Sequence, residues 1–445
     1  MLRLKNKLEG LERDKNPICI GVVGADETDT GQKGSTLIEQ IEHVPGITTL
    51  VVVDSSINEA ISAFKESGVS SQRIEVTENL SQASKAIAEG KRVATQNSDI
   101  VSKLSNIQVV LIATKDSEKA AVVAFKSIIE KKHVVMLNAL TDVTVGPVLK
   151  LMADNARVVY TFSAGDEPGV ILDLCSFAQI LGFKIIAAGK GKNNPLNHSV
   201  TPDDLKESSQ KAGVSPEVLT SFIDGTKTML EMTALANATG LIPDKRGMHG
   251  PKTSVNDLLN IFCLKEKGGI LSREGVVDYV IGNVAPGVFV IVKTEQETLI
   301  KDLEYLKMGE GPHYLLYRPY HLGNSESPLS IAKAVFDGEP SIAPLGAPVA
   351  ETIAVAKKDL KAGEEIDDIG GYKVYGTIER AEIVKAENLL PIGLAKGAKL
   401  LSDVKKDQAI SYDKVKLDES SFILMLRKLQ DKLEEVKLLK RFLLY

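Results

Sequence analysis

Cysteine is scarce in this chain of 445 residues, since Cys19, Cys175 and Cys263 are its only three and lie far apart in apolar sequence. They match neither a disulfide framework nor a zinc-binding spacing, which is typical of a reducing compartment. Long apolar runs are also missing, because no stretch approaches the roughly 18 residues that a membrane-spanning helix needs. The first residues lack the apolar core of a signal peptide. We therefore expect a cytoplasmic protein that neither spans nor binds a membrane.

Positive charge is not in excess, with 54 Lys and Arg against 59 Asp and Glu and a net charge of −5. A nucleic-acid-binding domain needs a basic face, so we do not expect nucleic acid as a partner. We expect a small-molecule substrate instead. The hydrophobic content of 43% is that of a globular protein. The chain is too long for one ordinary domain.

Residues 1–162 alternate between short strands rich in β-branched residues and helical segments, after an amphipathic helix within residues 1–15. This alternation predicts an α/β fold with a parallel, doubly wound sheet, which is the architecture of a dinucleotide-binding Rossmann domain. The expected strands are 18–23, 48–53, 109–114, 133–138 and 157–162, and the expected helices between them include 57–67 and 116–131.

A split glycine turn follows the first strand. Gly21 and Gly24 end the strand, Gly31 and Gly34 precede a helical run, and the acidic segment 26–30 separates the two pairs. Glycines let backbone N–H groups approach a pyrophosphate, and a helix N-terminus favours negative charge. We predict that these four glycines bind a dinucleotide. The acidic segment would repel the phosphates unless it points away or binds a cation.

Polar residues end three of the expected strands. Asp54 lies 20 residues beyond Gly34, the spacing of the acid that binds an adenosine ribose, which favours NAD(H) over NADP(H). Thr114 and Asn138 end later strands, and ligands of open α/β sheets lie beyond such ends. We predict that both line a nicotinamide pocket. The alternative is that each of the three residues only caps a turn or helix.

Residues 163–345 predict a second α/β domain, which we expect to bind the substrate. Strands are expected at 183–188, 276–281 and 288–293, and helices at 170–181 and 216–238. Asp166 and Glu167 lie between glycines where the two domains join. They could cap the next helix or bind a divalent cation together with water.

An unusual polar loop, 189–197, follows the strand predicted at 183–188. It contains Lys190, Lys192, Asn193, Asn194 and Asn197. The lysines could bind a phosphate or carboxylate or polarise a carbonyl, and the amides could hydrogen-bond hydroxyl groups. We predict that this loop contributes to the active site.

Three ionisable residues share one face of the helix predicted at 216–238. Asp224, Lys227 and Glu231 have i, i+3, i+7 spacing among apolar residues. Charges on a partly buried helix are costly unless they are paired or used, so we predict a role in the site. The alternative is a surface ion-pair series. His249, in a rigid glycine-rich loop, could act as an acid or base, and Arg318 with His321 forms a further candidate pair.

Residues 346–415 predict a small β-rich module, and residues 416–445 a helical tail. Leucines and one valine recur near heptad spacing in the tail. Either the tail packs on its own subunit or it forms a coiled coil.

Four blocks, 189–197, 224–232, 236–241 and 247–251, together resemble the homoserine-dehydrogenase-like oxidoreductases that carry a C-terminal SAF domain. The resemblance is strongest to the deoxyxylulose-phosphate-reductoisomerase-like proteins. It extends from about residue 17 to residue 415.

The resemblance implies a homo-oligomer with a Rossmann domain, a homoserine-dehydrogenase-like domain and an SAF module. It also implies rearrangement and reduction of 1-deoxy-D-xylulose 5-phosphate with NADPH and a divalent cation, Mg²⁺ or Mn²⁺. Carried over by position, the substrate pocket comprises Lys190, Lys192, Asn193, Asn194, Asn197, Asp224, Lys227 and Glu231. The departures concern the cofactor side: the acidic segment 26–30, Lys115 in place of a glycine, and Leu140 in place of an acid.

We therefore expect an NAD(P)-dependent oxidoreductase acting on a small hydroxylated, phosphorylated keto or polyol substrate, with reductoisomerase-like chemistry as the specific hypothesis. One alternative is a ligand-binding or regulatory homologue that has lost hydride transfer. Another is a sugar-acid lyase or isomerase.

Overall fold

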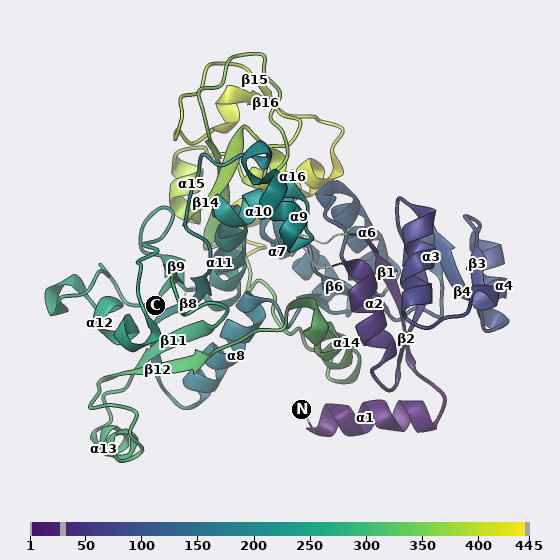
Figure 1. Cartoon of the computed structure of the whole chain (residues 1–445), viewed down its shortest axis with the longest axis horizontal. Helices are drawn as coiled ribbons and strands as arrows, with labels where there is room; N and C mark the ends of the chain where they lie inside the picture. Colours follow the sequence, from purple (N-terminus) through teal and green to yellow (C-terminus); the bar gives the residue numbers. More distant parts are fainter. Residues whose placement is uncertain (1, 27–32, 441–445) are drawn as a thin grey trace.

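The computed structural model describes residues 2–26 and 33–440, and these form three lobes (Figure 1). The N-terminal lobe, in purple and blue, lies to the right in this view. The teal and green lobe lies to the left, and the yellow-green C-terminal lobe sits above them. Among the described residues, every helix is too short or too polar to cross a lipid bilayer.

The N-terminal lobe contains a parallel sheet of seven strands in the order β3-β4-β2-β1-β5-β6-β7, which confirms the predicted α/β fold. The strands are β1 (Ile18–Val23), β2 (Ile47–Val53), β3 (Ile74–Val76), β4 (Arg92–Thr95), β5 (Val109–Ile112), β6 (His133–Met136) and β7 (Tyr160–Phe162). The helices are α1 (Leu2–Arg13), α2 (Gly34–Glu42), α3 (Ile57–Glu66), α4 (Leu80–Ala88), α5 (Asp99–Lys103), α6 (Ser117–Ile129) and α7 (Ala139–Ala156).

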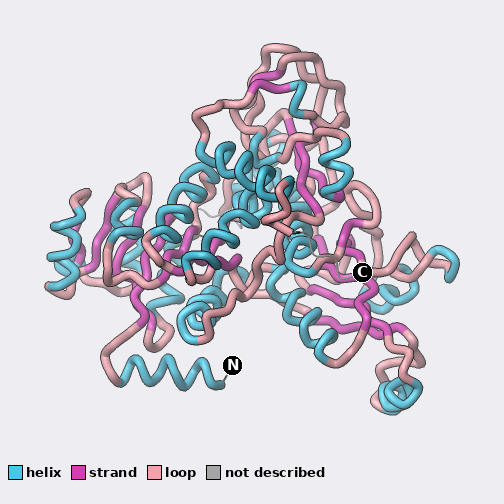
Figure 2. Tube along the Cα trace, turned by 180° about the vertical axis from the view of Figure 1, so that it is seen from behind, coloured by secondary structure: helices cyan, strands magenta, loops and turns pink. Residues whose placement is uncertain are grey.

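Both faces of this sheet are buried, as a parallel sheet requires. Val110 and Ile112 of β5 belong to one hydrophobic core, and Val109 and Leu111 belong to another. Alternate residues of a strand point to opposite faces, so the two cores lie on the two sides of the sheet. Figure 2 shows the helices on either side of these strands.

The second lobe contains a mixed sheet in the order β12-β11-β8-β10-β9. Its strands are β8 (Lys184–Lys192), β9 (Ile242–Pro243), β10 (Val276–Ile281), β11 (Val288–Lys293) and β12 (His313–Arg318). The helices of this part are α8 (Glu167–Ile180), α9 (Lys206–Ala212), α10 (Pro216–Ile223), α11 (Thr226–Thr239), α12 (Leu258–Ile261), α13 (Glu297–Tyr305) and α14 (Ser327–Phe336). The apolar residues of α8 and α11 pack on one face of this sheet.

Two predictions about local structure are wrong. The single helix expected at 216–238 is two helices, because α10 ends at Ile223 and α11 begins at Thr226. Gly225 between them has a φ of +93°, a conformation that favours glycine. The polar loop expected to begin at Gly189 begins later, because β8 continues to Lys192. Lys190 and Lys192 are therefore strand residues.

Helix α14 returns to the first sheet. Its residues Ile331 and Ala332 join the core beneath α1 and α2, and Ile342 bridges to Phe162 at the end of β7. The two sheets are thereby connected twice, once through residues 163–166 and once through this returning segment.

The C-terminal lobe has two small antiparallel sheets. Strands β13 (Ala350–Ala356) and β14 (Val374–Arg380) form one, and β15 (Lys399–Leu400) and β16 (Val415–Lys416) form the other; α15 (Ala381–Ala386) follows β14.

The final helix, α16 (Phe422–Glu435), packs on α6 and α7 of its own chain, which is one of the two alternatives expected for the tail. Arg427 forms a buried, bidentate ion pair with Glu351 of β13, with N–O distances of 2.6 and 2.7 Å. The side-chain amide of Gln430 accepts a hydrogen bond from Val148 N and donates one to Thr144 O of α7. α7 contains Pro147, and these are the groups that an uninterrupted helix would pair with each other.

A buried carboxyl group in α7 makes stability depend on pH. Asp142 accepts a hydrogen bond from Tyr160 Oη at 2.9 Å, and burial raises the pKa of its carboxyl to about 7. Because the folded-state pKa exceeds the unfolded one, this contribution to stability is complete below about pH 4 and is lost as the pH rises through 7. We expect Asp142→Asn to become more stable relative to the wild type between pH 5 and pH 8, by a few kcal/mol.

Urea unfolding at both pH values measures this difference. Asp154→Asn, at an exposed acid of the same helix, is the matched control and should shift little with pH. An equal response of the two variants would contradict the assignment.

Candidate functional site

A cavity of about 450 Å³ lies where the carboxyl end of β8 meets the first turns of α8 and α11. Eight residues predicted from the sequence line it: Asp166, Glu167, Lys190, Lys192, Asn193, Asn194, Lys227 and Glu231. Phe222, Ala285, Pro286 and the segment 321–323 are among the residues that complete its wall. We call this cavity the central pocket.

Lys190 lies at the centre of a buried ionic network. Lys190 and Lys192 are two residues apart on β8, so their side chains point to the same face of the sheet. The ammonium of Lys190 donates to the carboxylates of Glu167 and Glu231. Burial favours loss of its proton, but the two carboxylates outweigh burial and raise the pKa of Lys190. Lys190 is thus a permanently charged group.

Lys227 extends the network to Asp166. Its Nζ lies 3.5 Å from Asp166 Oδ2 and 3.6 Å from Glu231 Oε1. Asp166 also caps α8, accepting from the backbone N of Glu167 at 3.2 Å, as the capping alternative predicted. Burial raises the pKa of Asp166, and the charge of Lys227 offsets only part of that effect. The expected alternative of a surface ion-pair series is wrong, since these side chains are buried.

Lys192 has different partners. Its Nζ donates to the backbone carbonyl of Phe222 at 2.5 Å, and within residues 2–26 and 33–440 no carboxylate forms an ion pair with it. Burial, helped by the neighbouring ammonium of Lys190, lowers the pKa of Lys192 to about 8. The amine and ammonium forms are therefore both populated near neutral pH, as an acid–base catalyst requires.

Two predicted residues lie outside the pocket wall. Asp224 is fully buried, and its Oδ2 pairs with Nζ of Lys357 in the C-terminal lobe at 2.8 Å. It is not part of α11 and so does not share a helix face with Lys227, contrary to prediction. Asn197 uses its side-chain oxygen to accept from Ser199 N at 3.1 Å. Both residues hold the loop after β8 and the start of α11 in place.

His321 lines the central pocket, while Arg318, its predicted companion, binds Glu326 instead. Nδ1 of His321 lies 2.9 Å from Pro286 O, and its Nε2 lies 3.6 Å from Glu167 Oε1. Together with Asp166 and Glu167 it offers three ligand atoms within 4.8 Å of one another. A cation bound there would compete with Lys190 and Lys227 for the two carboxylates.

His249 belongs to a separate cluster. Its Nδ1 lies 3.1 Å from Asp278 Oδ2 and its Nε2 lies 3.4 Å from Asp244 Oδ2. Burial lowers the pKa of the imidazole. This cluster does not line the central pocket.

The glycine turn lies where the order of the first sheet reverses, between β1 and β5. Gly24 has a φ of +102°, and a Cβ there would lie 2.6 Å from Thr114 N. A Cβ on Gly34 would lie 2.3 Å from Gly24 O, and one on Gly21 would meet Val101. These glycines therefore allow β1, α2, α5 and the end of β5 to approach closely. Gly31 lies outside the described residues.

Asp54 holds this turn together from within. Its Oδ2 accepts from Ala25 N at 2.7 Å and from Asp26 N at 3.3 Å, and its Oδ1 accepts from Ser56 N at 2.9 Å. Only 4% of the residue is exposed. The same turn engages the first N–H groups of α2, because Gly34 N donates to Asp26 O. If Asp54 also bound a ribose, as predicted, its carboxylate would have to accept hydrogen bonds from the ribose hydroxyls and from these backbone N–H groups at the same time.

Thr114 and Asn138 connect the ends of β5 and β6. The amide of Asn138 donates to Thr114 O at 3.0 Å, and its Oδ1 accepts from Thr141 N at 2.7 Å, which caps α7. The expected helix-cap role therefore exists for Asn138. Its contact with nicotinamide stays a prediction, as does that of Thr114.

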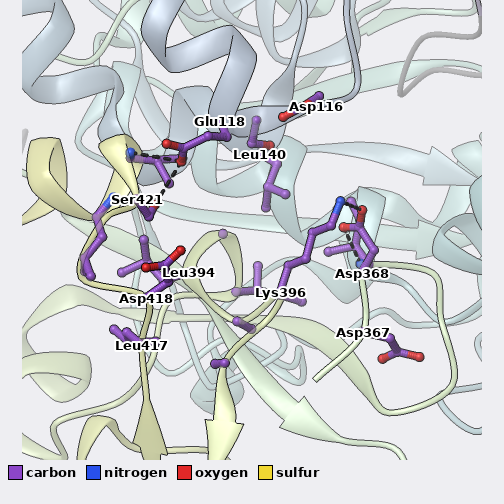
Figure 3. A pocket seen from close by; sticks show the side chains of 18 of the residues that line it. Asp116, Glu118, Leu140, Asp367, Asp368, Leu394, Lys396, Leu417, Asp418 and Ser421 are labelled. Atoms are coloured by element: carbon purple, nitrogen blue, oxygen red, sulfur yellow. Dashed lines mark hydrogen bonds and ion pairs between the residues drawn. The ribbon is translucent and has the colours of Figure 1, made fainter. Parts of the chain in front are cut away.

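A second cavity, of about 320 Å³, separates the first sheet from the C-terminal lobe (Figure 3). Lys115 and Leu140, two of the positions that depart from the resembled family, both line it. Glu118 reaches across to accept from Ser421 Oγ at 2.9 Å, and Lys396 pairs with Asp368 at 2.6 Å. The contact of Glu118 joins the start of α16 to the carboxyl edge of the sheet, whereas Lys396 and Asp368 both belong to the C-terminal lobe.

Comparison with known proteins concerns mainly the second lobe. Residues 165–327 match the family model described as "Oxidoreductase DRL, catalytic domain". This part of the chain is thus similar in sequence to an oxidoreductase catalytic domain. Every residue that lines the central pocket falls within the matched span. No curated protein matches the chain.

Several solved structures resemble the chain at low sequence identity. A probable dehydrogenase from Thermotoga maritima shares 14% identity with a TM-score of 0.41, over 72% of this chain and 90% of that one. A myo-inositol dehydrogenase from Corynebacterium glutamicum shares 10% with a TM-score of 0.40, over 72% and 89%. GenD2 from gentamicin A biosynthesis, in complex with NAD, shares 12% with a TM-score of 0.37, over 73% and 88%.

Proposed function

We propose that this protein is a nicotinamide-dependent oxidoreductase that takes a small polyhydroxylated substrate into the central pocket. The observation that carries the proposal is the coincidence of two findings. The span that matches an oxidoreductase catalytic domain contains the whole pocket, and that pocket holds a buried lysine able to exchange a proton near neutral pH. The match to an oxidoreductase catalytic domain supports the class of reaction. The buried lysine supports the choice of the residue that transfers the proton.

The first sheet offers a place for NAD(H) or NADP(H). Ligands of open α/β sheets lie at the carboxyl edge where the strand order reverses, and here the turn of Gly24 and Gly34 occupies that position. The absence of side chains at these two glycines keeps the turn compact, which fits a dinucleotide beside it. Thr114 and Asn138 would lie near its nicotinamide, and Asp54 near its ribose. The preference for NAD(H) stays a prediction. A bound nicotinamide would accept or supply the hydride.

Lys192 would move the proton at the reacting oxygen. In oxidation its neutral amine takes the proton from the substrate hydroxyl, and in reduction its ammonium returns a proton to the carbonyl oxygen. Lys190, held charged between Glu167 and Glu231, supplies a fixed positive charge where negative charge develops on that oxygen. Asn193 and Asn194 line the same pocket and would hydrogen-bond other hydroxyl groups of the substrate.

The charge of the pocket favours an uncharged substrate over a phosphorylated one. Lys190 and Lys227 are each neutralised by carboxylates, so the ammonium of Lys192, which predominates at pH 7 because its pKa is about 8, is the charge left without a carboxylate ion pair among the described residues of the pocket. A phosphate dianion entering the pocket would therefore meet little net positive charge. Reductoisomerase-like chemistry, which needs a phosphorylated substrate and a divalent cation, stays a narrower hypothesis, as do the homo-oligomer and the SAF assignment of the C-terminal lobe.

Titration with NADH and NADPH, followed by nicotinamide fluorescence, tests the proposal. We expect at least one cofactor to bind with a Kd well below about 1 mM, the weak limit of specific binding. Asp54→Asn distinguishes the two roles of Asp54: a ribose ligand would lose only NADH affinity, whereas a residue that holds the turn would weaken both cofactors alike. Failure of both cofactors to bind the wild type would contradict the proposal. Deoxyxylulose phosphate and unphosphorylated polyols, each with and without Mg²⁺ or Mn²⁺, complete the assay.

One observation favours a second function, that of a ligand-binding homologue without hydride transfer. In the glycine turn, the backbone N–H groups of Ala25, Asp26, Gly34 and Ser35 all donate to oxygens of the chain itself. A pyrophosphate normally accepts such donors. If neither cofactor binds, polyol binding alone, measured by calorimetry, would support this function.

A further inference from the structure

The three lysines of the central pocket differ in their partners. Lys190 contacts two carboxylates, and Lys227 lies near Asp166 and Glu231. Lys192 donates to one backbone carbonyl, and no ion pair to a carboxylate holds it among the described residues. A carboxylate keeps a lysine protonated, whereas a neutral carbonyl accepts a hydrogen bond from either form. Lys192 is thus the lysine of this pocket that can carry a free electron pair.

The surroundings of Lys192 enlarge the share of that neutral form, although the carboxylates of Asp224 and Glu231, beyond ion-pair distance, act in the opposite direction. Lys192 is 5% exposed, and Lys190, two residues away on the same face of β8, is a permanent cation. Desolvation next to another cationic group is one way in which proteins make a lysine amine nucleophilic. The side chain also lines an open cavity of about 450 Å³, so a small molecule can reach it.

We propose that Lys192 forms a Schiff base with small hydroxylated carbonyl compounds in the central pocket. Its neutral Nζ adds to the carbonyl carbon, which forms a C–N bond and gives a carbinolamine. Loss of the former carbonyl oxygen as water, which carries away both protons of the amine, leaves the imine. Atoms and charge balance without an oxidant, reductant or further reactant. The ammonium of Lys190 stabilises the oxyanion that precedes the carbinolamine.

This inference shares the pocket with the proposed function, but it needs no nicotinamide. Imine formation uses the same carbonyl compounds that the oxidoreductase would produce or consume. Binding of a cofactor and covalent capture by Lys192 can therefore succeed or fail independently. Capture without cofactor binding would leave this inference standing and remove the oxidoreductase function, and the reverse result would do the opposite.

Borohydride trapping tests the inference on the full chain. The protein is incubated with dihydroxyacetone at pH 7 and reduced, and the modified lysines are located by peptide mass spectrometry. At this pH the uncharged fraction of an amine with a pKa of about 8 is on the order of 100-fold larger than that of an ordinary lysine. We expect Lys192 to be modified at least tenfold faster than Lys184, at the exposed start of the same strand.

Lys192→Arg is the matched variant, because a guanidinium keeps the positive charge and forms no imine under these conditions. We expect it to lose the fast-reacting site and to retain slow modification of surface lysines. Equal rates at Lys192 and Lys184 in the wild type would overturn the inference. That comparison is made within one folded protein, so it does not depend on how well the variant folds.

Discussion

Lys192→Met is expected to lower kcat by about 10²- to 10⁴-fold, the usual contribution of a positioned acid–base group. Methionine keeps the length and apolar stem of lysine but removes the amine that accepts and returns the proton. The loss should appear mainly in kcat, because Asn193, Asn194 and Glu231 still line the pocket and would bind the substrate as before. Steady-state kinetics in both directions of the reaction measures it.

The pH profile separates this role from a structural one. Oxidation needs the neutral amine, so its kcat should rise as the pH increases through about 8, whereas reduction needs the ammonium and should fall over the same range. Lys192→Met should flatten both profiles in this region. Lys184→Met, at the exposed end of β8, should leave rate and profile unchanged. An inflection near pH 8 that survives in Lys192→Met would assign the proton transfer to another group.

Arg427→Met is expected to reduce the free energy of unfolding by about 3–5 kcal/mol, the cost of leaving one member of a buried ion pair without its partner. The pair joins α16 to β13, and both side chains are 7% exposed. The variant leaves the Glu351 carboxylate buried beneath α16 without its partner. Urea unfolding at neutral pH measures the effect.

Two further variants serve as controls for this loss of stability. Lys428→Met removes the neighbouring exposed pair with Glu419 and should cost less than about 1 kcal/mol. Arg427→Met combined with Glu351→Leu should recover most of the lost stability, because the fully buried carboxylate is then gone and Asp431, the other partner of Arg427, is 45% exposed. Similar losses in Arg427→Met and Lys428→Met would show that burial does not determine the strength of these pairs.

Much of the first sheet could be predicted because its strands are continuous β-branched runs. Residues 18–23 were expected as a strand and form β1 without change. The short strands β3 and β4 could not be foreseen, since their three and four residues carry no clear alternation and they form through pairing with each other and β2. The predicted helix 216–238 is too long because the residues around Gly225 have helical sequence, whereas the positive φ of Gly225 ends one helix and precedes the next.

Most of the charged residues of the central pocket can be predicted from the sequence, but the ion pairs that they form cannot. Unusual polarity after a buried strand pointed to Lys190 and Lys192, yet nothing in the spacing indicated that Glu167 would contact Lys190. That contact joins the start of α8 to the end of β8 through tertiary packing. His321 and Phe222 reach the pocket in the same way, from segments whose sequence resembles ordinary loops and helix ends. Asp224 illustrates the opposite error, since its charge serves Lys357 at a lobe interface.

The hydrogen bonds that Gln430 makes to α7 can form only late in the synthesis of the chain. Its amide bonds to backbone groups on either side of Pro147, 282 residues earlier at Val148. As the ribosome extends the chain, α7 is complete long before α16 exists. The polar groups that Pro147 leaves in α7 must therefore rely on water or on temporary partners until the chain has been made as far as Gln430. A helix made much later thus completes an earlier one.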